Sequence, residues 1–294
     1  MNTQRKVQRV ISPLAVSDGA GVKLNRLIAT PTLDYLDPFL LLDHFGSENS
    51  DDYIAGFPQH PHRGIETVTY MLKGVVHHKD TMGNAGTISE GDIQWMTAGG
   101  GMMHEEMPEA SPEGLSGFQL WVNLPAKLKM SKPRYQEIKA DKIPVFEKDG
   151  VKVKVIAGEV DDVKGAVSEI YAEPNYLDIT ISPNTTFTHQ IAEGHNAFAY
   201  IFEGSAEFEE NGKTIETNRL VIFNDGDFVK ITAGENGARF LLVSGKPLNE
   251  PVARYGPFVM NTKEEIYQAI SDLQNGTFNW TEDSHNLICS IQKN

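Results

Sequence analysis

The stretch HPHRGIETVTYMLKG, residues 60–74, combines two signals that decide the expected fold. His60 and His62 lie two residues apart at its start, and Glu66 follows them. The remainder, TVTYMLKG, is rich in β-branched and aromatic residues and ends at a glycine, which is typical of a strand that runs into a turn. Because side chains two apart in a strand point the same way, the stretch predicts a strand with both histidines on one face.

Even-numbered positions extend this face through Glu66 to the apolar residues Val68 and Tyr70. If the apolar side chains face the interior of a barrel, the imidazoles and the carboxylate are expected to face it too. Pro61 has no N–H to donate to a neighbouring strand. The histidines are therefore expected at a strand end or edge, at the mouth of the barrel.

A second pair, His104 and Glu106, repeats the two-residue spacing after the glycine-rich stretch 98–103. Burying several ionisable groups together is costly unless something compensates them, and a divalent cation does so most simply. An isolated histidine pair beside Pro58 and Pro61 would be interpreted as surface decoration. The second pair favours a metal site instead.

Imidazole and carboxylate ligands suit iron, manganese, zinc, copper or nickel, and the lack of cysteine ligands argues against a closed structural zinc site. Three histidines and one carboxylate leave about two positions open on an octahedral metal, which indicates chemistry or sensing.

The composition narrows the class of protein. The chain has 294 residues, a net charge of −14 and no basic stripe, so direct nucleic-acid binding is not expected. The single cysteine, Cys289, excludes an intrachain disulfide and fits a reducing compartment. No apolar run is long enough for a membrane span, and the first residues lack the apolar core of a secretion signal. We expect a cytoplasmic protein.

Strand-like patterns punctuated by glycine turns dominate the chain, for example at 151–155, 177–181 and 197–202, and they predict a sandwich or barrel. A brief helix is expected at 125–130. A longer one is expected over 262–276, where Thr262 and Glu265 can form a capping box and Gly276 can end the helix.

The chain also repeats itself, which suggests two copies of one β unit joined near residues 125–150. YMLKG and YIFEG end at Gly74 and Gly204, an offset of 204 − 74 = 130, and the GD and TAG motifs recur with an offset of 135. When the two halves are aligned with these offsets, the candidate ligands and Glu66 match residues that would not bind a metal here: Gln190, Ala192, Asn196, Arg239 and Leu241. His189 and His195 are interpreted as structural or surface residues, so one metal per chain is expected.

Several long motifs resemble the pirin family of bicupins. They are DPFLLLDHFG (37–46), HPHRGIETVTYMLKG (60–74), GDIQWMTAGGGMMHEEMPE (91–109), GFQLWVNLP (117–125) and EPVARYGPFVMNT (250–262). The resemblance runs from about residue 10 to 275. It implies an all-β fold of two cupin barrels, each a double-stranded β-helix or jelly roll, set face to face, with a few short helices including one near 263–274. An N-terminal metal-binding cupin (1–135) would precede a C-terminal cupin lacking the metal ligands (136–294).

Members of this family usually bind one divalent metal, most often Fe2+. The resemblance implies that His60, His62, His104 and Glu106 are its ligands here. A general cupin would use Glu66 as its carboxylate ligand, and strand parity permits either. In the pirin pattern Glu66 does not bind the metal itself but orients a ligand histidine or a water. The family's His-Arg-Asp-Ser stretch is His78-Lys79-Asp80-Thr81 here, which puts an arginine contact in doubt.

The family is also associated with oxygen-dependent ring opening of quercetin. A flavonol and O2 are therefore the expected substrates, with Glu106 or Glu66 as proton acceptor. The apolar residues near the ligands are Trp95, Met96, Met102, Met103, Met107, Phe57 and Trp121. Met102 is the expected pocket residue, since it shares the parity of His104, whereas Trp95 and Trp121 are expected in the core.

The alternative function is a metal- or redox-sensing regulatory protein that binds a transcription factor or a metabolic enzyme. A storage or purely structural cupin is the third possibility. The family pattern implies a monomer.

Overall fold

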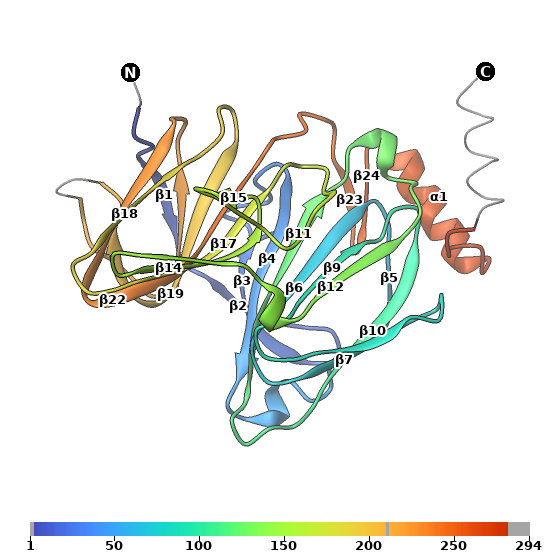
Figure 1. Cartoon of the computed structure of the whole chain (residues 1–294). Coiled ribbons are helices and arrows are strands. Elements are labelled where there is room, and N and C mark those ends of the chain that lie inside the picture. The colour runs from blue at the N-terminus through green and yellow to red at the C-terminus, as the bar shows by residue number, and fades with distance from the viewer. Residues whose placement is uncertain (1–2, 210–211, 282–294) are drawn as a thin grey trace. The chain divides into compact units, whose positions relative to one another are not determined.

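The computed structural model describes residues 3–209 and 212–281 (Figure 1). It forms two compact units, each made from separated stretches of chain. The histidine unit comprises Ala15–Ile28, Phe39–Ala140 and the chain from Leu248, and the apolar unit comprises the chain up to Leu14, Ala29–Pro38 and Asp141–Pro247. The predicted division at residue 135 stays a prediction, as does the face-to-face arrangement. Cys289 lies outside the described residues.

The histidine unit contains two main sheets. The larger has the order β12 (Arg134–Ile138), β9 (Ile93–Thr97), β6 (Ile65–Lys73), β11 (Leu115–Asn123), β4 (Phe39–Ser47), β3 (Val22–Ile28) and β2 (Leu14–Asp18). The smaller has the order β5 (Phe57–His62), β10 (Met102–Pro108), β7 (Val76–Asp80) and β8 (Ala85–Ile88). Both are built of antiparallel strand pairs, such as β6 with β9 and β11, and β10 with β5 and β7. A hairpin of β23 (Ala253–Tyr255) and β24 (Phe258–Met260) and the helix α1 (Lys263–Gln274) complete the unit.

Apolar side chains from both sheets of the histidine unit meet in one core. Leu24, Phe45 and Met71 come from the larger sheet, and Val76 and Ile88 come from the smaller. Burying these faces against each other removes apolar surface from water, and this holds two sheets together as a barrel.

The apolar unit is built on a nine-stranded sheet. Its main path runs β1 (Val7–Ile11), β21 (Arg219–Phe223), β19 (Asn196–Glu207), β22 (Phe228–Gly245), β17 (Asn175–Ile181), β14 (Val151–Ala157) and β13 (Val145–Lys148). Strands β18 (Thr186–Gln190) and β20 (Ile215–Glu216) pair with β22 and β19, and β15 (Glu159–Val160) pairs with β16 (Val163–Lys164). The expected alternation is present in β14, where Val151, Val153 and Val155 are buried and Lys152 is exposed.

The sheet pairings correct part of the predicted repeat. Strand β6 lies between β9 and β11, and β19 lies correspondingly between β21 and β22, which agrees with the Gly74 and Gly204 match. The matches at an offset of 135 are wrong, because the first GD–TAG stretch spans β9 whereas the second runs into β22. Short glycine motifs recur in β proteins and do not fix register by themselves.

The corrected pairing shows how the two units differ at the predicted site. Across β5 and β10, His104 lies opposite His60. Across β18 and β22, which hold the matching places in the apolar unit, Val229 lies opposite His189. His189 is buried, and burial lowers its pKa to about 4. An apolar residue therefore replaces the second imidazole there.

The predicted helix over 262–276 is confirmed by α1. Thr262 caps it, accepting from the Glu265 N–H while the Glu265 carboxylate accepts from the Thr262 N–H, and Gly276 follows with a φ of 72°. The helix expected at 125–130 is only a 3-10 turn, Ala126–Leu128. Among the described residues, no helix is long and apolar enough to cross a membrane.

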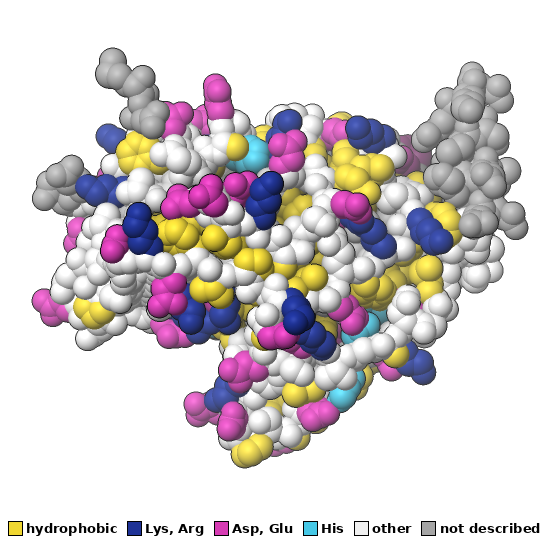
Figure 2. Space-filling view, viewed as in Figure 1, with side chains coloured by type: hydrophobic (Ala, Val, Ile, Leu, Met, Phe, Trp, Pro, Cys, Tyr) yellow, Lys and Arg dark blue, Asp and Glu magenta, His cyan; other side chains and the backbone are white. Residues whose placement is uncertain are grey.

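Figure 2 shows basic side chains scattered among acidic and neutral ones on the visible face, rather than gathered into a stripe.

Candidate metal centre

Two neighbouring strands bring the three predicted histidines together. His60 and His62 lie on the edge strand β5, as the prolines predicted, and His104 lies on β10 opposite His60. One ring nitrogen from each histidine lies within 4.8 Å of the others. Among residues 3–209 and 212–281, these three histidines are the one group of three or more histidine, cysteine or acidic side chains whose ligand atoms lie close enough to share a metal ion.

Two of the three imidazoles, His62 and His104, are held as neutral donors by burial. His62 and His104 are 2% and 0% exposed, and burial lowers the pKa of each well below its ordinary value. The His60 Nδ1–H donates to the Pro58 carbonyl at 2.9 Å, which leaves its Nε2 lone pair available as a ligand. A neutral imidazole with an available lone pair is the form that binds a metal.

Both ring nitrogens of His62 and of His104 are buried without a hydrogen-bond partner. Burying a polar nitrogen unpaired costs about 1–3 kcal/mol, so two such rings side by side need a compensating group. A divalent transition metal supplies one bond to each ring, and the donor set fits such an ion.

Glu106 lies beside the histidines. Its Oε2 is 4.0 Å from His104 Nε2, and its side chain faces the same side of β10 as His104. The Thr69 hydroxyl lies 3.2 Å from Glu106 Oε1 and 2.7 Å from Gln119 Oε1. The hydroxyl has one proton to donate to these two acceptors, so Glu106 and Gln119 share it.

Thr69 and Gln119 belong to a row of polar side chains that crosses the larger sheet. Each member is the direct cross-strand neighbour of the next, and in strand order they are Arg26, Asp43, Gln119, Thr69, Gln94 and Glu137. Neighbours of this kind have Cβ atoms about 5 Å apart. The row therefore fixes polar groups along one inner wall of the barrel.

Glu66 lies on the opposite face of the larger sheet. It is three residues from Thr69 in a strand whose pairing with β11 runs without a register shift from Ile65 to Tyr70, so the two side chains point to opposite faces. Glu66 is fully buried, and its Oε1 accepts from the Thr97 hydroxyl at 2.7 Å. Burial raises the pKa of Glu66 to about 7.

The parity inference that joined Glu66 to His60 and His62 is wrong. Gly64 has a φ of 80° and separates β5 from β6, which belong to different sheets. Counting by twos across this bend has no structural meaning. A role for Glu66 in catalysis stays a prediction from the sequence.

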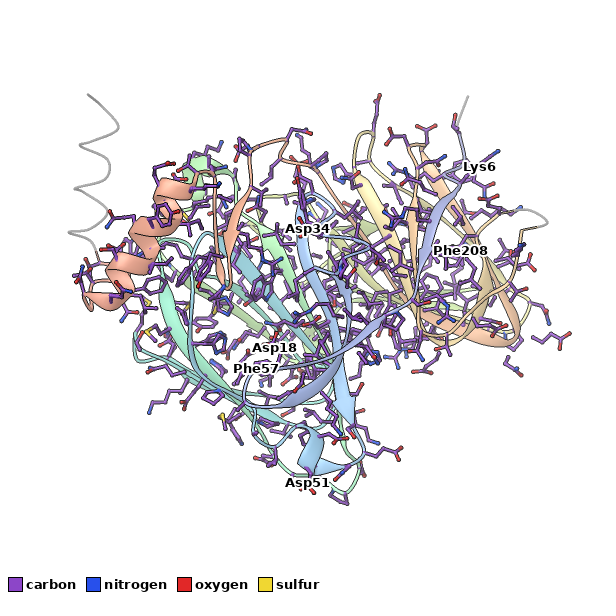
Figure 3. The ribbon with its side chains drawn as sticks, turned by 180° about the vertical axis from the view of Figure 1, so that it is seen from behind. Lys6, Asp18, Asp34, Asp51, Phe57 and Phe208 are labelled. Carbon is purple, nitrogen blue, oxygen red and sulfur yellow. The ribbon has the colours of Figure 1, made fainter. Side chains whose placement is uncertain are left out.

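A cavity of about 510 Å³ opens beside the histidines and is lined by His60, His62 and Glu106. Its apolar wall includes Val22, Leu24, Leu41, Phe45, Tyr53, Phe57, Val76, Leu115 and Trp121. Asp18 and Phe57, labelled in Figure 3, both line it. Such a volume suits a small organic ligand.

The structure corrects which apolar residues form the wall. Met102 shares the His104 face, but it is fully buried, packs with Met96 and Ala98, and does not line the cavity. Trp121 was expected in the core. It lines the cavity, and its ring centroid lies 5.2 Å from that of His62 in an edge-to-face arrangement.

The cavity wall also carries charged residues that the sequence did not reveal. Arg26 Nε and Nη2 donate to the two carboxylate oxygens of Asp43 at 2.9 and 2.8 Å, and Nη2 also donates to Asp18 at 2.7 Å. Arg254 lies over the Trp121 ring at 5.2 Å. Only the strand register brings Arg26 and Asp43 together, so no short-range pattern could have found them.

The stretch His78-Lys79-Asp80-Thr81 begins in β7, next to β10. His78 and Asp80 are buried and Lys79 is exposed. His78 Nε2 lies 2.5 Å from Glu137 Oε1, and Asp80 Oδ1 accepts from the Asn84 N–H at 2.8 Å. Lys79 therefore faces away from the histidine cluster.

Comparisons with known proteins agree with this architecture. The family model described as Pirin matches residues 21–122, and the model described as Pirin C-terminal cupin domain matches residues 176–279. A Pseudomonas aeruginosa protein whose name provisionally assigns quercetin 2,3-dioxygenase activity is 46% identical over 282 residues, covering 94% of this chain and 99% of its own.

Solved structures show the same fold. Quercetin 2,3-dioxygenase from Acinetobacter baumannii matches with a TM-score of 0.85 and 37% identity, over 94% of this chain and 99% of that one. A bacterial pirin from Escherichia coli, solved with nickel(II), matches with a TM-score of 0.64 over 81% of this chain and 100% of its own. At 22% identity this match supports the fold alone. The expected all-β fold of two cupin domains is confirmed, and the chain belongs to the pirin family.

Proposed function

We propose that this protein is a metal-dependent dioxygenase that opens flavonols such as quercetin with O2, using one iron(II) ion held by His60, His62, His104 and Glu106. One observation carries the proposal: three imidazoles, two of them buried with unpaired nitrogens, converge beside a cavity of about 510 Å³ that His60 and His62 line. The names of the similar proteins supply the substrate class.

The protein's own part is to bind and orient a planar ligand. Phe57 and Trp121 line the cavity together with aliphatic side chains, and contact with them favours a flat aromatic molecule. The polar wall around Arg26 and Asp43 offers fixed hydrogen-bonding groups to hydroxyls on the ligand. Burial in this cavity excludes water from the reacting end of the ligand.

His60, His62, His104 and Glu106 would hold the metal, which would supply Lewis-acid activation of the flavonol 3-hydroxyl for a reaction with O2 that gives a depside and carbon monoxide. Glu106 is the proposed acceptor of the hydroxyl proton, because it lines the cavity beside the histidines and Glu66 faces the other side of its sheet. Thr69 orients the Glu106 carboxylate by hydrogen bonding.

A first prediction concerns Trp121. Replacing it with leucine removes an aromatic wall of the cavity and is expected to raise the dissociation constant of a flavonol about tenfold, equivalent to about 1.4 kcal/mol. Anaerobic absorbance titration of the metal-loaded protein measures this constant. The control Phe202→Leu removes an aromatic ring from the apolar unit and should leave the flavonol dissociation constant unchanged. Equal constants for all three proteins would contradict the assigned binding cavity.

The proposed function is tested with protein purified anaerobically, loaded with iron(II) and mixed with quercetin in air. We expect the flavonol absorbance to fall, with uptake of O2 and release of carbon monoxide. An iron-loaded protein that leaves quercetin intact, yet binds a partner protein in only one oxidation state of the iron, would replace the enzyme proposal with the sensor alternative.

A further inference from the structure

The last part of the histidine unit is joined to the turn that follows His62. This C-terminal segment, Ala253–Trp280, contains the β23–β24 hairpin and α1, which lie on the same side of the unit as β5 in Figure 1. The Val259 N–H donates to the Arg63 carbonyl at 3.1 Å, and the Arg63 N–H donates to the Pro257 carbonyl at 3.4 Å. The backbone after His62 is thus paired with the hairpin.

The Arg63 side chain strengthens this connection. It is 3% exposed, its Nη1 donates to Asp272 Oδ2 at 2.6 Å, and its Nη2 donates to the Phe278 carbonyl at 3.0 Å. The guanidinium also lies 4.5 Å from the centroid of the Phe278 ring. A buried guanidinium needs such partners, because a charge removed from water is costly when it is unpaired.

Gly64 and Lys129 fix the same turn from the other side. A Cβ at Gly64 would lie 2.0 Å from the Val259 carbonyl oxygen, so no other residue fits there. The buried Lys129 ammonium donates to the carbonyls of Gly64 and Val259 at 3.0 and 2.8 Å. The turn and the hairpin are therefore tied by one shared cation.

The His62 ring depends on this support because neither of its nitrogens has a hydrogen-bond partner. His60 differs, since its Nδ1 is held by the Pro58 carbonyl. The orientation of His62 is set by its backbone and by edge-to-face contacts with His60, His104 and Trp121. Arg254 of the hairpin lies over the Trp121 ring. The backbone after His62 and the Trp121 ring both contact the C-terminal segment.

We propose that the C-terminal segment is part of the metal centre, and that Arg63 and Asp272 are positioning residues that set the orientation of His62. The inference rests on the metal site of the proposed function and does not depend on flavonol cleavage. The same segment contributes Arg254, Gly256 and Pro257 to the cavity wall, so it would couple metal binding to the shape of the ligand site.

The test compares Asp272→Asn with Asp52→Asn. Both substitutions remove the acid of a 2.6 Å ion pair in the histidine unit, and the two acids are similarly exposed, at 21% and 20%. Competition with a chromophoric chelator, using cobalt(II) as the probe, measures metal affinity. We expect Asp272→Asn to raise the dissociation constant about tenfold or more and to alter the cobalt absorption bands, Asp52→Asn to change neither, and Asp272→Glu to restore part of the affinity.

A second readout needs no metal. Hydrogen exchange of the peptide covering residues 57–66 in the metal-free protein should be faster in Asp272→Asn than in the wild type or Asp52→Asn. Phe278→Leu, which keeps the ion pair, should move both readouts the same way to a smaller degree and serves if Asp272→Asn does not fold.

An equal loss of thermal stability with and without cobalt, at unchanged affinity and unchanged exchange, would overturn the proposal and leave Asp272 a purely structural role. A wild type that does not bind cobalt at all would instead refute the metal site, and the exchange measurement would still decide whether the segment orders the turn after His62.

Discussion

Replacing His104 with alanine is expected to weaken metal binding by at least about 100-fold, since loss of an outer partner alone costs up to this much. The His104 ring contacts both other imidazoles of the cluster, with ring centroids 4.4 Å from His60 and 5.1 Å from His62. Flavonol cleavage should disappear together with the metal. Elemental analysis after dialysis and the quercetin absorbance assay measure the two losses.

Chelation gives the matching control. A strong chelator should lower the melting temperature of the wild type, because a ligand bound only to the folded state stabilises it. It should not change that of His104→Ala. His77→Ala, at an exposed histidine of the adjacent strand β7, should behave like the wild type. Full metal content in His104→Ala would remove this residue from the site.

The second large effect is expected at Glu66, whose pKa burial raises from an ordinary value near 4.5 to about 7. The folded protein therefore binds this proton more tightly than the unfolded chain does. Protonated Glu66 therefore makes its full contribution to the free energy of unfolding below pH 4.5. This contribution is lost as the pH rises through about 7, and above that pH the free energy of unfolding is lower by about 3 kcal/mol.

Glu66→Gln removes this titration and keeps the shape of the side chain. Relative to wild type, the variant should gain about 3 kcal/mol in free energy of unfolding between pH 4 and pH 8. Urea unfolding of metal-free protein at the two pH values measures the gain. Glu90→Gln, at an exposed position, should show none. Parallel pH profiles for Glu66→Gln and wild type would show that Glu66 is not held in its protonated form.

The sequence predicted which side chains lie together where the pattern was local. The two-residue spacings of His60 and His62, and of His104 and Glu106, describe side chains on one face of a single strand, and the structure brings these side chains together. The capping box at Thr262 was also readable, because it involves residues three apart.

The predictions that were wrong depended on register across a bend or between strands. Gly64 lies between two strands of different sheets, so parity could not be carried from His62 to Glu66. Trp121 lines the cavity and Met102 does not, because packing between the sheets decides this rather than distance along the chain. The contribution of the C-terminal segment to the turn after His62 likewise joins residues that are far apart in sequence.

The central claim is that His60, His62 and His104 together bind one metal ion. Crystals of iron-loaded protein, measured on both sides of the iron absorption edge, test it most directly through the anomalous difference map. We expect one peak per chain, within bonding distance of all three imidazoles and next to Glu106. A fully loaded protein whose peak lies elsewhere, or whose three histidines make no contact with it, would contradict the account.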